Sequence, residues 1–256
     1  MKKEEILFLS PATYSVLLLF LIGIFFFSCT NNNTPEKKFA EKTSEFSFYI
    51  PALKTAPSPP PFADSSMCDI QTLDSSIHVH LVYSTTENFI GKDVYGDLER
   101  AYLRKEIAYK IVTAQKKLKS IEPSYSLLIL DAARPHHVQQ TMWDAVKGTD
   151  KRRYVAYPGN NSNHNYGAAV DLTIMDTRSG KQLDMGTPFD CFEELAWPLN
   201  EVKFLQEGKL TQKQVENRKL LRNCMRQGGF GYSVHEWWHF NGFRDSVIRV
   251  LYPVIP

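Results

Sequence analysis

Two short stretches of the 256-residue chain carry the side chains best suited to chemistry. Residues 162–171 read Ser-Asn-His-Asn-Tyr-Gly-Ala-Ala-Val-Asp, and residues 235–239 read His-Glu-Trp-Trp-His. Catalytic zinc takes three protein ligands, often imidazole nitrogens and carboxylate oxygens, and keeps a fourth position open for water. His164, Asp171 and His239 would supply such a set, so we expect one Zn²⁺ per chain on these side chains.

Glu236 stands three residues before His239. A tight turn or a strand end at that spacing would hold its carboxylate over the open position of the metal without making it a ligand. Zinc lowers the pKa of a bound water, and a carboxylate in that place can take the proton as a general base. We therefore expect Glu236 to be the catalytic base.

Other histidines offer weaker alternatives. His78 and His80 fall on one face of an expected strand and could in principle grip a metal, but the same spacing arises on any solvated strand face. His235 lies beside the expected base and is assigned at most a supporting role. We favour the first set because its members occur together in two motifs, whereas an isolated histidine is more often a structural residue.

The sequence around these motifs predicts the elements that must position them. Strands are expected over residues 77–83, 127–130, 170–174 and 230–234, where apolar residues alternate or run together. Helices are expected over residues 103–118, 135–146 and 211–228, and the last begins with the capping box Thr-Gln-Lys-Gln. This order predicts an α+β fold, a single domain with helices packed on a mainly antiparallel sheet around a mononuclear zinc site.

Arg134 is expected at the exit of the strand over 127–130, just before Pro135 opens a helix. An arginine there presents a permanently charged, rigid fork of donors that can stabilise a developing oxyanion. The alternative is a surface arginine in an ordinary strand-to-helix turn.

The two motifs together, S-x-H-x(2)-G-x-A-x-D followed by E-W-W-H, closely resemble those of the VanX-like D-alanyl-D-alanine dipeptidases. The resemblance runs from about Ile77 to Phe243. It implies zinc on the three ligands named above, with Glu236 as the base. The D-x-x-R-P sequence over 131–135 also matches, which implies the oxyanion role for Arg134.

The resemblance further implies the substrate and its contacts. Residues 83–91 match Tyr-x-T-x-x-N-F-x-G, which makes Tyr83 a substrate-pocket residue, and residues 185–190 match M-G-x-x-F-D. Asp190 thereby inherits the role of holding the substrate's free ammonium, while Ser162 and Tyr83 would lie near its carboxylate. The implied reaction is zinc-dependent hydrolysis of free D-Ala-D-Ala to two D-alanines.

Two rival functions remain open. A D,D-carboxypeptidase or peptidoglycan endopeptidase would use the same zinc chemistry on wall stem peptides. A non-catalytic wall-binding lipoprotein would need neither Glu236 nor Arg134, so their presence argues against it. Cleavage of D-Ala-D-Ala and of whole muropeptides, assayed side by side, separates the three functions.

Composition sets broader limits. A hydrophobic content of 43% over 256 residues can bury one sizeable core. The formal charge of +2 and the scatter of basic residues among acidic ones give no indication of a nucleic-acid partner.

The N-terminal residues indicate export. Residues 1–29 read as a lipoprotein-type signal peptide, with Lys2 and Lys3, an apolar run over 16–27 and then Cys29 as the expected lipidation site. The alternative is an uncleaved anchor, although twelve apolar residues are short for a spanning helix, which needs about 20. Residues 30–66 are rich in Asn, Lys, Ser and Pro and read as a disordered tether before a catalytic domain over 67–256. We expect a periplasm-facing membrane lipoprotein of the bacterial envelope.

Three further cysteines, Cys68, Cys191 and Cys224, would then lie in an oxidising compartment. An odd number permits at most one internal disulfide, and no pairing is favoured. The alternative is that all three are small buried apolar residues.

Overall fold

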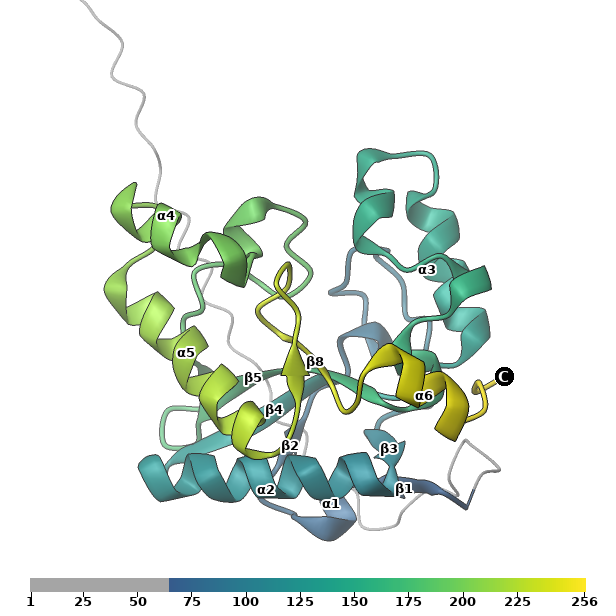
Figure 1. Cartoon of the computed structure of the whole chain (residues 1–256), viewed down its shortest axis with the longest axis horizontal. Coiled ribbons are helices and arrows are strands. Elements are labelled where there is room, and N and C mark those ends of the chain that lie inside the picture. The colour runs from purple at the N-terminus through teal and green to yellow at the C-terminus, as the bar shows by residue number, and fades with distance from the viewer. Residues whose placement is uncertain (1–64) are drawn as a thin grey trace, which may run out of the picture. The chain divides into compact units, whose positions relative to one another are not determined.

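A computed structural model of the chain describes residues 65–256 (Figure 1). The expected signal peptide, Cys29 and all but the last two residues of the expected tether lie outside these residues. Over the described range, the chain has no helix with the length and apolar character needed to cross a membrane.

A six-stranded sheet forms the centre of the fold, with strand order β2-β4-β5-β8-β7 and β6 paired to β5. Its strands are β2 (His78–Val79), β4 (Tyr125–Asp131), β5 (Ala169–Asp176), β6 (Lys181–Gln182), β7 (Gly231–Tyr232) and β8 (His239–Asn241). The β2–β4 pair is parallel and the other pairs are antiparallel. A separate two-stranded antiparallel sheet joins β1 (Met67–Asp69) to β3 (Tyr102–Arg104).

Within residues 65–256 the three predicted helices are present, together with three α-helices that the sequence did not predict. The α-helices are α1 (Ile70–Leu73), α2 (Lys105–Ile121), α3 (His136–Val146), α4 (Glu201–Gln206), α5 (Gln212–Gln227) and α6 (Asp245–Leu251). Short 3₁₀ helices are η1 (Val82–Ser84), η2 (Asp150–Tyr154), η3 (Pro158–Asn160), η4 (Asn163–Tyr166), η5 (Glu194–Ala196) and η6 (Pro198–Asn200). The α+β class and the mainly antiparallel sheet are confirmed.

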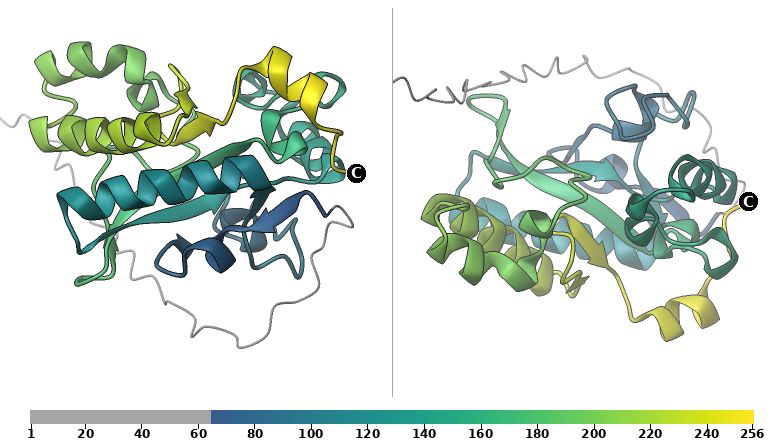
Figure 2. Two further views of the ribbon diagram at one scale, coloured as in Figure 1. Left: turned by 60° about the horizontal axis from the view of Figure 1, so that its bottom comes forward. Right: turned by 90° about the horizontal axis from the view of Figure 1, so that it is seen from above.

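One face of the sheet carries the main core. α2 and α5 lie side by side on it, as Figure 2 shows. Every third or fourth residue of α2 is buried there, at Ile107, Ile111, Ala114 and Leu118. Leu172 and Ile174 of β5 join this core cluster. Because side chains alternate along a strand, Asp171 and Thr173 point to the opposite face. The functional side chains therefore lie on the face away from α2 and α5.

The predicted strand over 77–83 is wrong in its second half. β2 ends at Val79, and the chain then turns into η1, with the backbone N–H of Thr85 donating to the carbonyl of Val82. The side chain of Asn88 stabilises this turn by donating to the carbonyls of Val82 and Thr85. Local side-chain to backbone bonds of this kind compete with strand pairing. As a result Tyr83 is buried rather than lying on a strand face.

The other predicted strands and helices are present, but some of them begin or end at different residues. The expected strand over 230–234 is reduced to β7, and the expected first helical residue Leu103 lies in β3 instead. Thr211 caps α5 by accepting from the backbone N–H of Gln214, and the helix gives way to a glycine pair, which confirms the capping box. The three described cysteines are free, and Cys224 is buried.

Candidate active site

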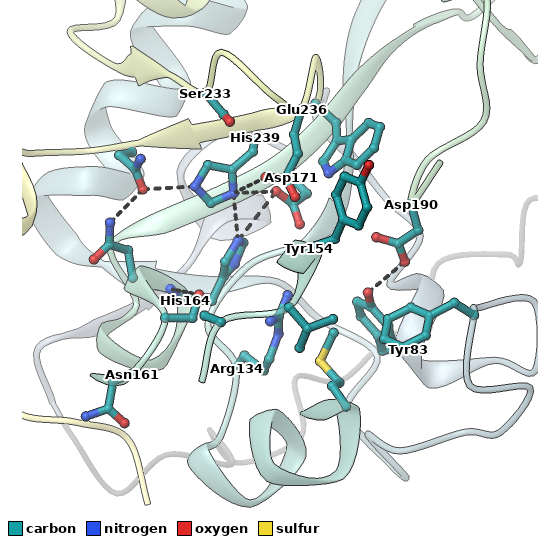
Figure 3. A pocket seen from close by; sticks show the side chains of 18 of the residues that line it. Tyr83, Arg134, Tyr154, Asn161, His164, Asp171, Asp190, Ser233, Glu236 and His239 are labelled. Carbon is teal, nitrogen blue, oxygen red and sulfur yellow. Dashed lines mark hydrogen bonds and ion pairs between the residues drawn. The ribbon is translucent and has the colours of Figure 1, made fainter. Parts of the chain in front are cut away.

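A cavity of about 330 Å³ opens on the sheet face that carries Asp171. Figure 3 shows side chains that line it. The lining comes from the segment after β2, the turn after β4, α3, η2 and the segment that follows it, η4, β5, the loop before η5, the β7–β8 turn, β8 and α6. Polar groups dominate this lining. Ligand sites of this volume accommodate small molecules.

His164, Asp171 and His239 converge in this cavity, as the sequence predicts. Asp171 of β5 and His239 of β8 are direct cross-strand partners, so the antiparallel register alone brings these two side chains together. His164 reaches them from η4. We call these three residues the triad.

The triad fits a zinc ion. His239 Nδ1 lies 2.9 Å from Asp171 Oδ1, His164 Nε2 lies 3.4 Å from the same oxygen, and the two nitrogens are 3.2 Å apart. Ligands on bonds of about 2.0–2.1 Å around a tetrahedral zinc are about 3.3 Å from each other. The three atoms therefore lie close to three corners of such a tetrahedron, which leaves the fourth corner for another ligand.

Both imidazoles are oriented by bonds on their outer nitrogens. His164 Nδ1 donates to the carbonyl of Ala132 at 2.7 Å, and His239 Nε2 donates to Asn241 Oδ1 at 3.0 Å. These assignments of donor and acceptor follow from the partners, which both accept. With a metal ion bound, each ring would present an unprotonated nitrogen to the centre of the triad, as a metal ligand must.

The electrostatics of the triad favour a bound cation. Burial by itself would raise the pKa of Asp171, but the charges and hydrogen bonds of His164 and His239 lower it far below its usual range. Burial opposes protonation of His239, yet Asp171 and Glu236 raise its pKa to about 9. The carboxylates thus hold positive charge at this point, and a metal ion would replace the proton.

Glu236 lies beside the triad without joining it. Its Oε2 atom is 4.0 Å from His239 Nδ1, and the turn between β7 and β8 brings it there. Burial raises the pKa of Glu236, and the charge of Asp171 adds to this effect. A carboxyl with a raised pKa close to a metal position is suited to proton transfer.

Arg134 is buried and held by two partners. Its Nε donates to Asp131 Oδ2 at 3.0 Å, its Nη2 bonds the same oxygen, and its Nη1 donates to Gln139 Oε1 at 2.7 Å. Burial alone would lower the pKa of Arg134, but Asp131 raises it well above its usual value. The guanidinium is therefore a fixed positive charge in the cavity wall. It is not the surface arginine of the alternative interpretation.

Backbone bonds tie this arginine to the triad. The N–H of Arg134 donates to the carbonyl of His164 at 3.0 Å, and Asn165 Nδ2 donates to the carbonyl of Arg134 at 2.9 Å. The turn after β4 and η4 thus form one unit. A shift of Arg134 would move a triad residue with it.

Tyr83 and Asp190 form a pair at one end of the cavity. The Tyr83 hydroxyl donates to Asp190 Oδ2 at 2.7 Å. Burial raises the pKa of Asp190 well above its usual value, with further contributions from the charges of Asp171 and Glu236. This carboxyl faces the cavity without a cationic partner within salt-bridge distance among residues 65–256, so a cationic group of a ligand would be stabilised beside it.

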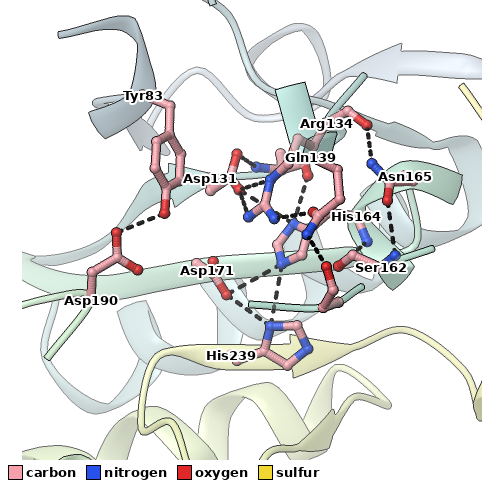
Figure 4. A network of polar contacts seen from close by, with 12 residues as sticks. Tyr83, Asp131, Arg134, Gln139, Ser162, His164, Asn165, Asp171, Asp190 and His239 are labelled. Atoms are coloured by element: carbon pink, nitrogen blue, oxygen red, sulfur yellow. Dashed lines mark hydrogen bonds and ion pairs between the residues drawn. The ribbon is translucent and has the colours of Figure 1, made fainter. Parts of the chain in front are cut away.

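Ser162 lies on the other side of the triad. Figure 4 shows Tyr83 and Asp190 at one side, Ser162 at the other and the triad between them. Ser162 caps η4, where its hydroxyl accepts from the N–H of His164 at 3.4 Å. The Tyr83 hydroxyl is bonded to Asp190 instead of lying beside Ser162, and the contact of Ser162 and Tyr83 with a substrate carboxylate stays a prediction.

Comparisons with known proteins agree with this geometry. The family model Peptidase_M15, described as D-ala-D-ala dipeptidase, matches residues 63–253. The chain belongs to this family. It is a metallopeptidase.

Curated relatives bear the same family description. The chain is 32% identical over 178 residues to the D-alanyl-D-alanine dipeptidase of Escherichia coli K12, a match that covers 69% of this chain and 84% of the relative. It is 28% identical over 174 residues to the enzyme of that name from Enterococcus faecium, covering 62% and 82%. A solved LD-carboxypeptidase, LdcB, aligns over 75% of both chains at 18% identity with a TM-score of 0.39, a likeness too small to carry an argument.

The site also contains residues to which the sequence analysis assigned no role. Asp131, which the D-x-x-R-P motif contains, fixes Arg134, and Gln139 one helical turn further on holds the same guanidinium. Asn241 orients His239 and itself accepts from Asn163 Nδ2 at 2.9 Å. The only sequence signal for Asn163 and Asn241 is their closeness to the two motifs. The alternative ligands His78, His80 and His235 lie outside the triad, and the ring of His235 packs on Trp197 at a centroid distance of 4.6 Å.

Proposed function

We propose that this metallopeptidase hydrolyses the free dipeptide D-Ala-D-Ala to two D-alanines with one zinc ion held by the triad. The observation that carries the proposal is the carboxyl of Asp190, which faces the cavity at one end of the triad and has no cationic side chain within salt-bridge distance in residues 65–256. A dipeptide laid across the triad would place its ammonium there. The names of the curated relatives support the same substrate.

Separate groups in the site have separate roles in the reaction. Bound zinc would supply Lewis-acid chemistry, polarising the scissile carbonyl and lowering the pKa of water. Glu236 takes the proton of the attacking water and hands it to the leaving amine. Arg134, fixed by Asp131, stabilises the negative charge that develops on the carbonyl oxygen.

Binding contacts set the orientation of the substrate. Asp190 holds the ammonium, and the Tyr83 hydroxyl fixes the orientation of that carboxylate through its 2.7 Å bond. Ser162 lies across the triad, on the side where the carboxylate of the second D-alanine would lie. A carboxyl at one end and a hydroxyl donor at the other would suit the ammonium and the carboxylate of a dipeptide.

An assay of the zinc-loaded protein on D-Ala-D-Ala and on whole muropeptides, side by side, tests this function. We expect cleavage of the dipeptide and little release of D-alanine from muropeptides. The reverse preference would indicate a D,D-carboxypeptidase or endopeptidase. Cleavage of neither substrate would favour a wall-binding role.

We also propose that residues 1–29 direct export and that Cys29 is lipidated, which would hold the domain at the bacterial envelope. Three sequence features support export and membrane attachment: the lysines near the N-terminus, the apolar run over 16–27 and the cysteine that follows it. Cys29→Ser should shift the protein from the membrane fraction to the soluble fraction and remove the lipid mass. An unchanged membrane fraction would favour an uncleaved anchor.

A further inference from the structure

Side chains on one face of α5 form hydrogen bonds with the loop that carries Asp190. This loop, residues 184–195, leaves the sheet after β6 and ends in η5. We call it the Asp190 loop. Asp190 lies near its middle with a φ of 57°, a left-handed conformation that a non-glycine residue adopts only when its surroundings hold it there.

Arg218 joins the two ends of this loop. Its Nε donates to the carbonyl of Met185 at 2.6 Å, and its Nη1 donates to the carbonyl of Leu195 at 3.1 Å. These carbonyls are ten residues apart in the sequence. A planar guanidinium with several donors can hold two such acceptors at a fixed separation, whereas a lysine ammonium has no rigid fork.

Neighbours on the same face of α5 strengthen the first of these ends. Asn217 Nδ2 donates to the carbonyl of Asp184 at 2.8 Å, and Gln214 Nε2 donates to the Asp184 carboxylate at 2.8 Å. Residues spaced by three and four positions share one side of a helix. Gln214, Asn217 and Arg218 of α5 therefore all bond to this loop.

The burial of Arg218 shows that it is not a solvated helix residue. Its side chain is 0% exposed, and its Nη2 has no hydrogen-bond partner in the described chain. Burial lowers the pKa of Arg218 to about 10, with Glu201 3.7 Å from Nη1 acting in the opposite direction, so the side chain stays charged at neutral pH. Burying a charged group is costly, and the bonds to the two loop carbonyls, together with the ion pair to Glu201, compensate this cost.

We propose that Arg218, supported by Asn217, is a positioning residue that sets the place of the Asp190 carboxylate in the cavity. Other contacts also act on the loop, among them the 2.8 Å bond from Trp237 Nε1 to Thr187 Oγ1. Among the side chains of residues 65–256, Arg218 is the one whose hydrogen bonds reach both ends of the loop. This inference rests on the proposed role of Asp190 as the ammonium-binding group.

The test compares Arg218→Lys with Arg222→Lys in the full-length, zinc-loaded protein. Arg222 lies one turn further along α5 and forms a two-point ion pair with Glu201, with bonds of 2.7 and 2.6 Å, but within residues 65–256 it forms no hydrogen bond with the loop. It is therefore a matched control for the loss of an arginine fork. The readouts are hydrogen exchange of the amides over 185–195 and kcat/KM for D-Ala-D-Ala and for N-acetyl-D-Ala-D-Ala.

We expect Arg218→Lys to speed exchange across the loop and to lower kcat/KM for the free dipeptide about ten- to a hundred-fold, mainly through KM. The N-acetylated substrate, which has no ammonium, should be cut as by wild type. Arg222→Lys should change neither readout. In an Asp190→Ala background, Arg218→Lys should have no further effect on the preference.

Two results would overturn the inference: unchanged exchange in the loop, or an equal loss on both substrates, which a purely structural arginine would give. A wild type without preference for the free dipeptide would instead contradict the role of Asp190, and the exchange measurement alone then decides whether Arg218 positions the loop. If Arg218→Lys does not fold, Asn217→Ala is the second variant. It removes the bond to Asp184 alone, and the same readouts apply.

Discussion

The carboxylate of Glu236 lies 4.0 Å from Nδ1 of His239, beside the triad and outside it. This relationship separates proton transfer from metal binding, because one side chain of the β7–β8 turn can act on water while its neighbour holds zinc. Replacing Glu236 should therefore stop catalysis without releasing the metal.

We expect Glu236→Gln to lower kcat roughly a hundred- to ten-thousand-fold, the range found for loss of a general base. Elemental analysis should still find one zinc per chain. The glutamine has nearly the same shape as the glutamate, so folding serves as the control through an unchanged melting temperature. Loss of stoichiometric zinc in this variant would make Glu236 a ligand.

Alanine at His164, Asp171 or His239 should weaken zinc binding and, with it, stability. A ligand that binds only the folded state raises the free energy of unfolding, by about 2.7 kcal/mol when free zinc is 100 times its Kd. Thermal melts with and without added zinc measure this increment, which should shrink in all three variants. His235→Ala is the control and should keep the wild-type increment. Wild-type zinc affinity in all three triad variants would contradict the ligand assignment.

Arg134→Ala should lower kcat more than it raises KM, since the contact strengthens as the oxyanion forms. Loss of one oxyanion donor costs about 3 kcal/mol, or roughly a hundred- to a thousand-fold in rate. Because the change leaves Asp131 buried without its partner, the melting temperature must be followed in parallel. Arg134→Lys keeps the positive charge, so its kcat should lie between those of wild type and Arg134→Ala. A pure KM effect would assign Arg134 to substrate binding only.

Asp190 should make the stability of the zinc-free protein depend on pH. Its folded pKa is raised, so its neutral form is the one that the fold favours. The stability that this group contributes is complete below its unfolded pKa and is lost as pH rises through the raised folded value. Asp190→Asn removes this loss. The variant's melting temperature, measured with a chelator, should therefore gain on wild type as pH increases above about 4. If the difference in melting temperature between Asp190→Asn and wild type did not change with pH, the pKa of Asp190 would not be raised in the folded protein.

The sequence predicts the triad well because residue types and local spacing define it. His164, Asp171 and His239 are recognisable in two motifs, and alternation along β5 correctly assigns Asp171 to the face away from the core. By contrast, the register that pairs Asp171 with His239 is a non-local property of the sheet. No pattern within one segment contains it.

Other parts of the site depend on contacts that the sequence does not reveal. The alternating pattern over 77–83 predicts a continuing strand, but the side chain of Asn88, five residues after Tyr83, bonds to the backbone and turns Tyr83 toward Asp190. Arg218 falls in a helix rich in charged residues and would be assigned to solvent, yet it is fully buried against the Asp190 loop. In both cases a polar side chain bonds to backbone carbonyls, which are local for Asn88 and distant in the sequence for Arg218.

The most direct measurement of the proposed function is the ratio of kcat/KM for D-Ala-D-Ala to that for N-acetyl-D-Ala-D-Ala, in wild type and in Asp190→Ala. Breaking a desolvated charge pair by removing one partner costs about 2 to 5 kcal/mol, so wild type should prefer the free dipeptide roughly thirty-fold to several thousand-fold. Asp190→Ala should lose most of that preference. Equal cleavage of the two substrates by wild type would contradict the dipeptidase function and leave a zinc peptidase that acts on longer peptides.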